Sequence, residues 1–221
     1  DCGHAYGINT HGQIVGWMSD CPSVSDERAT LFDPTGDGNN IDLGIPDDGR
    51  DWDSKAVSIN AAGQIVGTTL WNWWVPGDPP PMMSYATLFD PSGGGEHVNL
   101  GALGGDWSEA YSVNNGGQIV GLASATYGSG GWGHRATLFD PTGEGNNINL
   151  GTLPGGGESQ ASSINDLGQI VGYADDASGN QHAALFDPSG TGNNVDLGML
   201  PGAAWSWATS INNAGQIVGG S

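Results

Sequence analysis

The stretch Gly168-Gln-Ile-Val-Gly172 decides the fold, because the chain carries it five times. The other copies span Gly12–Gly16, Gly63–Gly67, Gly117–Gly121 and Gly215–Gly219, so the motif recurs every 47 to 54 residues. Self-similarity at a regular period indicates a repeat architecture. We therefore expect a single repeat domain over residues 1–221, with units at about 5–44, 56–101, 110–151 and 161–198 and a partial unit at 208–219.

Each unit contains four short segments with the alternation typical of β-strands. The first, as in Ala161–Asn165, leads through an Asn-x-x-Gly turn into the Gly-Gln-Ile-Val-Gly segment. The third, as in Ala136–Asp140, runs into Asp-Pro-Thr-Gly, whose residues suit a type I turn, and the fourth follows at Asn147–Gly151. Period-2 patterning without any helix-length 3.6-residue pattern predicts an all-β chain.

Four-stranded antiparallel units of this length are typical of propeller blades. The first two segment types occur five times and the last two only four times. The sequence thus predicts a β-propeller-type repeat with four complete blades and a partial fifth, and it leaves ring closure open. The last strand, Gly215–Gly219, is uncharged and free of Pro, so it would be a sheet edge able to pair with another copy. Truncation by chain fragmentation, or burial of that hairpin in a closed five-blade ring, is the alternative.

The charge is strongly negative, with 24 acidic against four basic residues and a net charge of −20. Such a surface repels phosphate backbones and anionic lipid head groups, so nucleic acid and membrane surfaces are poor partners. No apolar run approaches the roughly 18 residues that a membrane span needs. Self-association, neutral glycans, other surface proteins and cations remain as partners.

Cys2 and Cys21 are the only cysteines, and no metal-ligand spacing accompanies them. A disulfide is therefore predicted, with two buried free thiols as the alternative. The chain opens on Asp1 without a signal sequence, as expected of a processed product or a fragment. A disulfide fits an oxidising setting, and we expect an extracellular or cell-surface location.

Several segments resemble the HAF repeat, a probable extracellular repeat of bacterial proteins: Ser163–Gly172, His182–Phe186 and Asn149–Gly155. The resemblance extends over nearly the whole chain, but the His-Ala-Phe element is altered. His182 keeps the histidine, whereas Arg28 and Arg135 replace it in two other units. The resemblance implies an exported, propeller-like protein with bacterial-type secretion, and it brings no catalytic residues.

All nine tryptophans lie in or beside the variable connections, which strand alternation places at one end of the blades. Loops carry function more often than the scaffold does, and clustered exposed aromatic residues indicate a partner. These side chains could stack on glycan rings, contact another subunit or pack the ends of the blades. The candidate binding residues are Trp71, Trp73, Trp74, Trp107, Trp132, Trp205 and Trp207.

The Asp-Pro-Thr-Gly turns at the opposite end offer a calcium interpretation, because Asp33-Pro-Thr-Gly-Asp-Gly38 begins like a calcium loop. The candidate ligands are Asp33, Thr35 and Asp37 and, in a second turn, Asp140, Thr142 and Glu144. Neither turn has a Glu at position 12, and the turns at Asp90 and Asp187 lack the third ligand. A plain type I turn is the simpler interpretation, and no cofactor is otherwise expected.

No nucleophile elbow, His-Glu-x-x-His helix, phosphate loop or CxxC pair occurs in the chain. The leading hypothesis is therefore a non-catalytic extracellular structural or adhesive protein, the protomer of a self-assembling surface filament. A glycan-binding lectin that uses the Trp-bearing loops is the alternative. A glycoside hydrolase comes third and has no support from the sequence.

Overall fold

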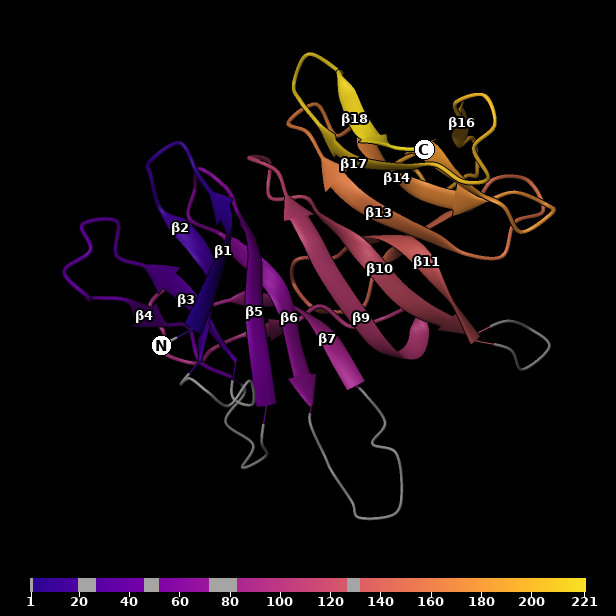
Figure 1. Ribbon diagram of the computed structural model, residues 1–221. Helices are drawn as coiled ribbons and strands as arrows, with labels where there is room; N and C mark the ends of the chain where they lie inside the picture. The colour runs from indigo at the N-terminus through magenta and orange to yellow at the C-terminus, as the bar shows by residue number, and fades with distance from the viewer. Residues whose placement is uncertain (1, 20–26, 46–51, 72–82, 127–131) are drawn as a thin grey trace.

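The computed structural model of the chain is a succession of small antiparallel sheets (Figure 1). It describes residues 2–19, 27–45, 52–71, 83–126 and 132–221, and no helix occurs among them. The first sheet contains β1 (Cys2–Ile8), β2 (Ile14–Ser19), β3 (Arg28–Phe32) and β4 (Ile41–Asp42). The second contains β5 (Trp52–Ile59), β6 (Ile65–Trp71), β7 (Met83–Phe89) and β8 (Val98–Asn99).

The third and fourth sheets repeat this plan, and a hairpin ends the chain. In the third sheet, β9 (Gly104–Val113) lies beside β10 (Ile119–Thr126), which is followed by β11 (Trp132–Phe139) and β12 (Ile148–Gly151). The fourth contains β13 (Ser159–Ile164), β14 (Ile170–Asp175), β15 (Gln181–Phe186) and β16 (Val195–Gly198). The hairpin consists of β17 (Trp207–Ile211) and β18 (Ile217–Gly220). The prediction of an all-β repeat with four complete units and a partial fifth is confirmed.

The first glycine of each Gly-Gln-Ile-Val-Gly motif is required by the turn before the second strand. Gly12, Gly63, Gly117, Gly168 and Gly215 have φ between 76° and 80°. In the third sheet the turn is closed by a hydrogen bond from the Gly117 N–H to the Asn114 carbonyl, 3.0 Å long. Side chains rarely adopt positive φ, so glycine is the favoured residue there. The backbone conformation of the turn therefore accounts for a glycine at these five positions.

The last glycine of the motif is required for a different reason, namely the close approach of the neighbouring strand. A Cβ atom added to Gly121 would lie 1.9 Å from the Glu109 carbonyl oxygen. The equivalent strand pairs shift register here by one residue, for example between Ala161 and Ser163, which is a β-bulge. The bulged strand therefore leaves no room for a side chain, which explains why both ends of the motif are glycine.

Neighbouring sheets pack face to face through apolar side chains. Between the second and third sheets, Val66, Ala86 and Leu100 pack in one cluster with Ile119 and Phe139. Similar clusters join the first sheet to the second, the third to the fourth, and the fourth to the hairpin. The sheets follow one another in an arc, and the first sheet and the hairpin do not pack on each other to close a ring (Figure 1). None of the described residues forms a helix long and apolar enough to cross a membrane.

Candidate functional site

A ladder of asparagine side chains links each sheet to the next. The Asn114 side-chain amide donates one hydrogen bond to Gln118 Oε1, 2.8 Å away in its own turn, and another to the Asn165 carbonyl of the next sheet, 3.0 Å away. Both amide hydrogens are thus used, one within a sheet and one between sheets. The inter-sheet bond occurs four times: Asn9 to Asn60, Asn60 to Asn114, Asn114 to Asn165 and Asn165 to Asn212.

A second ladder runs beside it through the following residue. The Asn115 N–H donates to Asp166 Oδ1 at 2.9 Å, and the Asp166 N–H donates to Asn213 Oδ1 at 2.9 Å. The Asp166 carboxylate also accepts hydrogen bonds from the side-chain amides of Asn115 and Asn213. The backbone hydrogen bond from Asn115, followed by those of the Asn213 and Asn115 side chains, lowers the pKa of Asp166 below its usual value.

The asparagine ladder is open at both ends of the described chain. Asn212 Nδ2 donates to Gln216 Oε1 within its own hairpin, and no further sheet offers it a carbonyl. At the other end, the Asn9 carbonyl accepts the Gly12 N–H, and no preceding sheet among the described residues donates to it. One end therefore presents a donor and the other an acceptor of the same repeated hydrogen bond.

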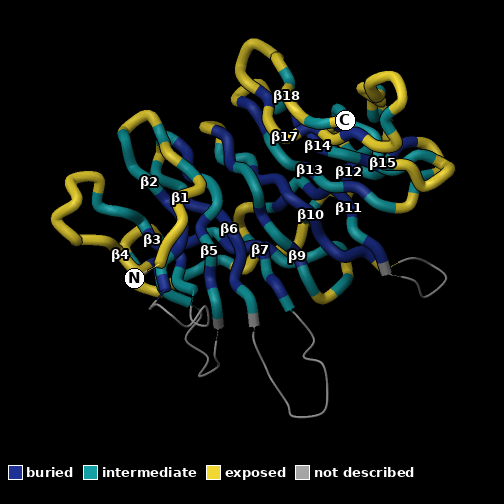
Figure 2. The backbone as a smooth tube through the Cα atoms, in the orientation of Figure 1, coloured by how far each residue is buried: buried dark blue, intermediate teal, exposed yellow. Residues whose placement is uncertain are grey.

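The apolar part of the interface is also open at both ends. Ile8 in β1 is 67% exposed, whereas its equivalents are 6–7% exposed: Ile59, Val113, Ile164 and Ile211. Val218 in β18 is 61% exposed, whereas its equivalents are completely buried: Val15, Val66, Val120 and Val171. Figure 2 shows the same contrast, with exposed backbone along β1 and β18 and buried strands between them.

We call these surfaces the N-terminal face (Ala5, Ile8 and the Asn9 carbonyl) and the C-terminal face (Val218, Asn212 and Asn213). They lie at the two ends of the series of sheets, since each interior sheet uses one such side towards its predecessor and the other towards its successor. The two faces are therefore the two halves of an interface that the chain already forms four times.

A polar cavity of about 330 Å³ lies where the first strands of all five units end. Its lining includes Asn9, Asn60, Asn114, Asn165 and Asn212, which are the residues of the first ladder. The side-chain amides of these residues are used in that ladder. No group of three His, Cys, Asp or Glu residues that could hold a metal ion occurs in the part of the chain that the structure describes.

The tryptophans in or beside the variable connections have diverse surroundings. Trp17 is buried, and its Nε1 donates to the Tyr6 hydroxyl at 3.2 Å, so it packs within the first sheet. Trp107 contacts the His134 ring edge to face, with ring centroids 4.8 Å apart. Trp205 and Trp207 are exposed near the C-terminal hairpin. Trp73 and Trp74, like the side chains of Trp52, Trp71 and Trp132, lie outside the described residues, so a common tryptophan surface stays a prediction.

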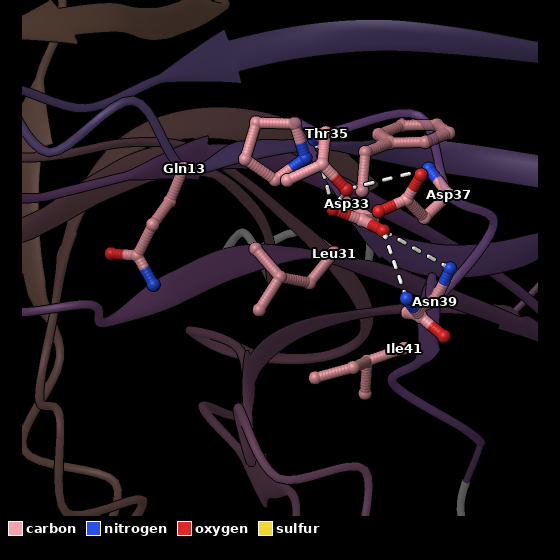
Figure 3. Close-up of a pocket in the computed structure, with 9 residues that line it drawn as sticks. Gln13, Leu31, Asp33, Thr35, Asp37, Asn39 and Ile41 are labelled. Atoms are coloured by element: carbon pink, nitrogen blue, oxygen red, sulfur yellow. Dashed lines mark hydrogen bonds between the residues drawn. The ribbon is translucent and has the colours of Figure 1, made fainter.

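The carboxylates of the predicted calcium turns are used to close those turns. Asp33 Oδ1 accepts hydrogen bonds from the Thr35 N–H and hydroxyl, at 2.9 and 2.7 Å, and Oδ2 accepts from Asn39 (Figure 3). These bonds, with that of the Thr35 hydroxyl first, lower the pKa of Asp33. Asp140 makes the same bonds with Thr142 and Asn146.

Residues Asp37 and Glu144 contribute to these turns through their backbone N–H groups, which donate to the hydroxyls of Thr35 and Thr142 at 3.3 Å. A hollow of about 420 Å³ beside the first of these turns is lined by Gln13, Leu31 and Ile41 as well as by the turn itself (Figure 3). The geometry matches the type I turn interpretation and adds no further ligand to the predicted calcium set.

The predicted disulfide joins a described residue to one outside the described ranges. Cys2 begins β1, no cysteine among the described residues is free, and Cys21 lies outside them. The pairing stays a prediction. The asparagine ladders were missed by the sequence reasoning, which interpreted the Asn before each Gly-Gln-Ile-Val-Gly as a turn residue. The signal was the constant Asn-x-x-Gly-Gln spacing, in which Asn and Gln always occur together.

Comparisons with known proteins give no assignment of their own. A scan of the chain against known protein families found no match. A search of curated proteins also found no relative. The resemblance to the HAF repeat therefore stays a prediction, and function is argued from the geometry of the two faces.

Proposed function

We propose that this is a non-catalytic, extracellular structural or adhesive protein whose copies join end to end into a filament. The single observation that carries the proposal is the pair of open faces. Ile8 and Val218 are more than half exposed, while every residue at the equivalent positions is at least nine-tenths buried. Monomeric proteins seldom leave a repeated, self-complementary interface uncovered, because exposed apolar surface favours association.

The joint would reuse the contacts between neighbouring sheets. The Val218 side chain of one copy would pack against the Ile8 region of the next copy, and Asn212 Nδ2 would donate to the Asn9 carbonyl. The backbone N–H of Asn213 would donate to the hydroxyl of Thr10, which occupies the position of Asp166 in the second ladder. Each contact extends a pattern already present inside the chain, where it holds successive sheets together.

The symmetry of such a joint favours a filament. The two faces differ from each other, so the contact is heterologous, and each added copy presents a new open face. A heterologous contact forms a ring only if its rotation closes, and otherwise propagates. The net charge of −20 opposes assembly through repulsion between copies, so assembly is expected to strengthen as salt screens that repulsion.

The test is to measure mass in solution as a function of protein concentration by size exclusion with light scattering, together with negative-stain imaging. The chain is expected to form species larger than a monomer, with particles elongated in one direction. Val218→Asp is expected to weaken association by roughly tenfold to a hundredfold, because burial of a valine contributes about 1.5–3 kcal/mol. Ile8→Asp on the opposite face is expected to act in the same way.

Leu167→Asp is the matched control. Leu167 is 71% exposed in a turn of the fourth sheet, it belongs to neither face, and the variant introduces the same charge. It is expected to leave association unchanged. A protein that stays monomeric at high concentration and high salt would overturn the proposal, as would a Val218→Asp variant that associates as well as Leu167→Asp.

Glycan binding is the second candidate, because Trp205 and Trp207, two residues apart in the sequence, are both exposed. Aromatic faces of this kind stack on sugar rings. A glycan array probed with the monomeric Val218→Asp variant separates the two candidates. Binding that is lost in Trp205→Ala and retained in Leu167→Asp would favour the lectin function, whereas the joint requires no glycan.

A further inference from the structure

Among the described residues, the hairpin of β17 and β18 leaves one edge of a strand unpaired. In the fourth sheet, β14 lies between β13 and β15 and pairs with both. The equivalent strand of the hairpin, β18, pairs with β17 alone. The backbone groups along the other edge of β18 are therefore available, and an unpaired edge of this kind is a template for strand addition.

A groove of about 450 Å³ lies along this edge. Leu197 from β16 forms part of its wall, together with Ile217, Trp207 and Gly219 from the hairpin. Leu197 is 41% exposed, whereas Leu43, Leu100 and Leu150 at the same position are completely buried. The next sheet covers those three leucines. Leu100, for example, lies in the same apolar cluster as Phe139, which is in the third strand of the following sheet. The groove thus lies where a third strand would complete the sheet.

The four complete sheets indicate which side chains of an added strand would fill the groove. Phe186 is paired with Ile170, and Ala184 with Gly172. In the second sheet, Phe89 is paired with Ile65, and Thr87 with Gly67. A strand added to β18 in the same register would place Phe opposite Ile217 and Thr or Ala opposite Gly219.

Those two positions point in the same direction, because side chains two residues apart lie on one side of a strand. In the second to fourth sheets these positions are almost fully buried: Thr87, Thr137 and Ala184 at 0–2% and Phe89, Phe139 and Phe186 at 2%. Each of these Phe side chains shares an apolar cluster with the leucine of the preceding sheet. Residues 197–221, which include most of the groove wall, contain no Asp, Glu, Lys or Arg in a chain of net charge −20. The groove therefore suits an uncharged strand that buries a phenylalanine side chain in it.

We propose that the free edge of β18 and the adjoining groove bind an extended segment of a partner polypeptide with the pattern Thr or Ala, Leu, Phe. The segment runs antiparallel to β18. Its backbone pairs with the edge, its Phe and its Thr or Ala fill the groove over Leu197, and its Leu lies opposite Val218. The backbone edge of β18 takes no part in the stacking of the two faces, although Val218 borders the groove and belongs to the C-terminal face. The site can therefore be tested on the monomeric chain, without filament formation.

The probe is a fluorescently labelled synthetic peptide with the sequence of residues 134–140, which carries Arg-Ala-Thr-Leu-Phe-Asp. Binding to the full chain is measured by fluorescence anisotropy at a protein concentration below the onset of any self-association. The peptide is expected to bind saturably and to change the fluorescence of Trp207, which borders the groove. A second peptide with Asp in place of the Phe is expected to bind at least tenfold more weakly.

Variants of the protein complete the test. Leu197→Asp is expected to weaken binding of the parent peptide at least tenfold, while Leu167→Asp leaves it unchanged. Circular dichroism melting checks that Leu197→Asp is folded, and the comparison of the two peptides on the unaltered chain remains decisive if it is not. Absence of binding at millimolar peptide, or equal binding of the two peptides, would overturn the proposal. Peptide binding without any larger species, or larger species without peptide binding, separates this proposal from the proposed function.

Discussion

The asparagine ladder allows a direct comparison, because equivalent residues occupy its interior and its open C-terminal end. Asn114 is 3% exposed, and its side chain takes part in three hydrogen bonds: to Gln118 Oε1, to the Asn165 carbonyl and from the Gln118 N–H. Asn212 is exposed, and its side chain also takes part in three, all within its own hairpin. The two residues thus differ in burial and in the inter-sheet bond.

Replacing Asn114 with Ala is expected to lower the free energy of unfolding by about 3 kcal/mol. Each hydrogen bond contributes about 1 kcal/mol on average, and the groups left behind are buried, where water does not replace the lost partner. For a chain of this length the change corresponds to a fall in melting temperature of roughly 6–12 °C. Asn212→Ala is expected to cost less than about 1 kcal/mol, because water solvates the exposed groups that it leaves.

The assay is thermal and urea-induced unfolding of both variants and the parent chain, followed by circular dichroism at a concentration where the chain is monomeric. Repeat proteins can unfold in more than one step, so the first transition is compared as well as the midpoint. Equal losses for Asn114→Ala and Asn212→Ala would refute the reasoning, since they would show that the bond between sheets contributes nothing beyond the turn.

Two further predictions concern the backbone and the cysteines. Gly121→Ala is expected to destabilise the chain by roughly 3 kcal/mol or more, because its Cβ would lie 1.9 Å from the Glu109 carbonyl oxygen, whereas Gly117→Ala, at φ 78°, is expected to cost about 1–2 kcal/mol. Denaturation midpoints that rank the two variants in the opposite order would contradict the bulge argument. Intact mass after alkylation, with and without prior reduction, is expected to show Cys2 and Cys21 protected in the unreduced chain; two alkylated thiols in that sample would rule the disulfide out.

Most of the fold was predictable because it is local. The turn residues, the period-2 strands and the return of each motif every 47 to 54 residues specify a four-stranded antiparallel unit without reference to distant parts of the chain. The unfinished fifth unit also follows from the sequence, because it is a matter of counting segments. The positive φ of Gly117 and its equivalents was predictable for the same reason.

The candidate site was predictable only in part. The sequence identified the last hairpin as unfinished and its final strand as an edge, and both features are present at β18. It did not identify the N-terminal face, because Ile8 has the same sequence context as the buried Ile59. Nor did it give the burial of the individual tryptophans, because Trp17, which is buried, and Trp205, which is exposed, both lie in or beside variable connections rich in small residues.

Local sequence patterns specify the unit: its strands, its turns and its number of copies. How the units are joined depends on the three-dimensional arrangement, because the bond from Asn114 to Asn165 and the packing of Leu100 with Phe139 link residues that no local pattern relates. That arrangement also decides where the joining stops. Exposure is a property of what lies opposite a residue in space, so identical motifs are buried inside the series of sheets and exposed at its two ends.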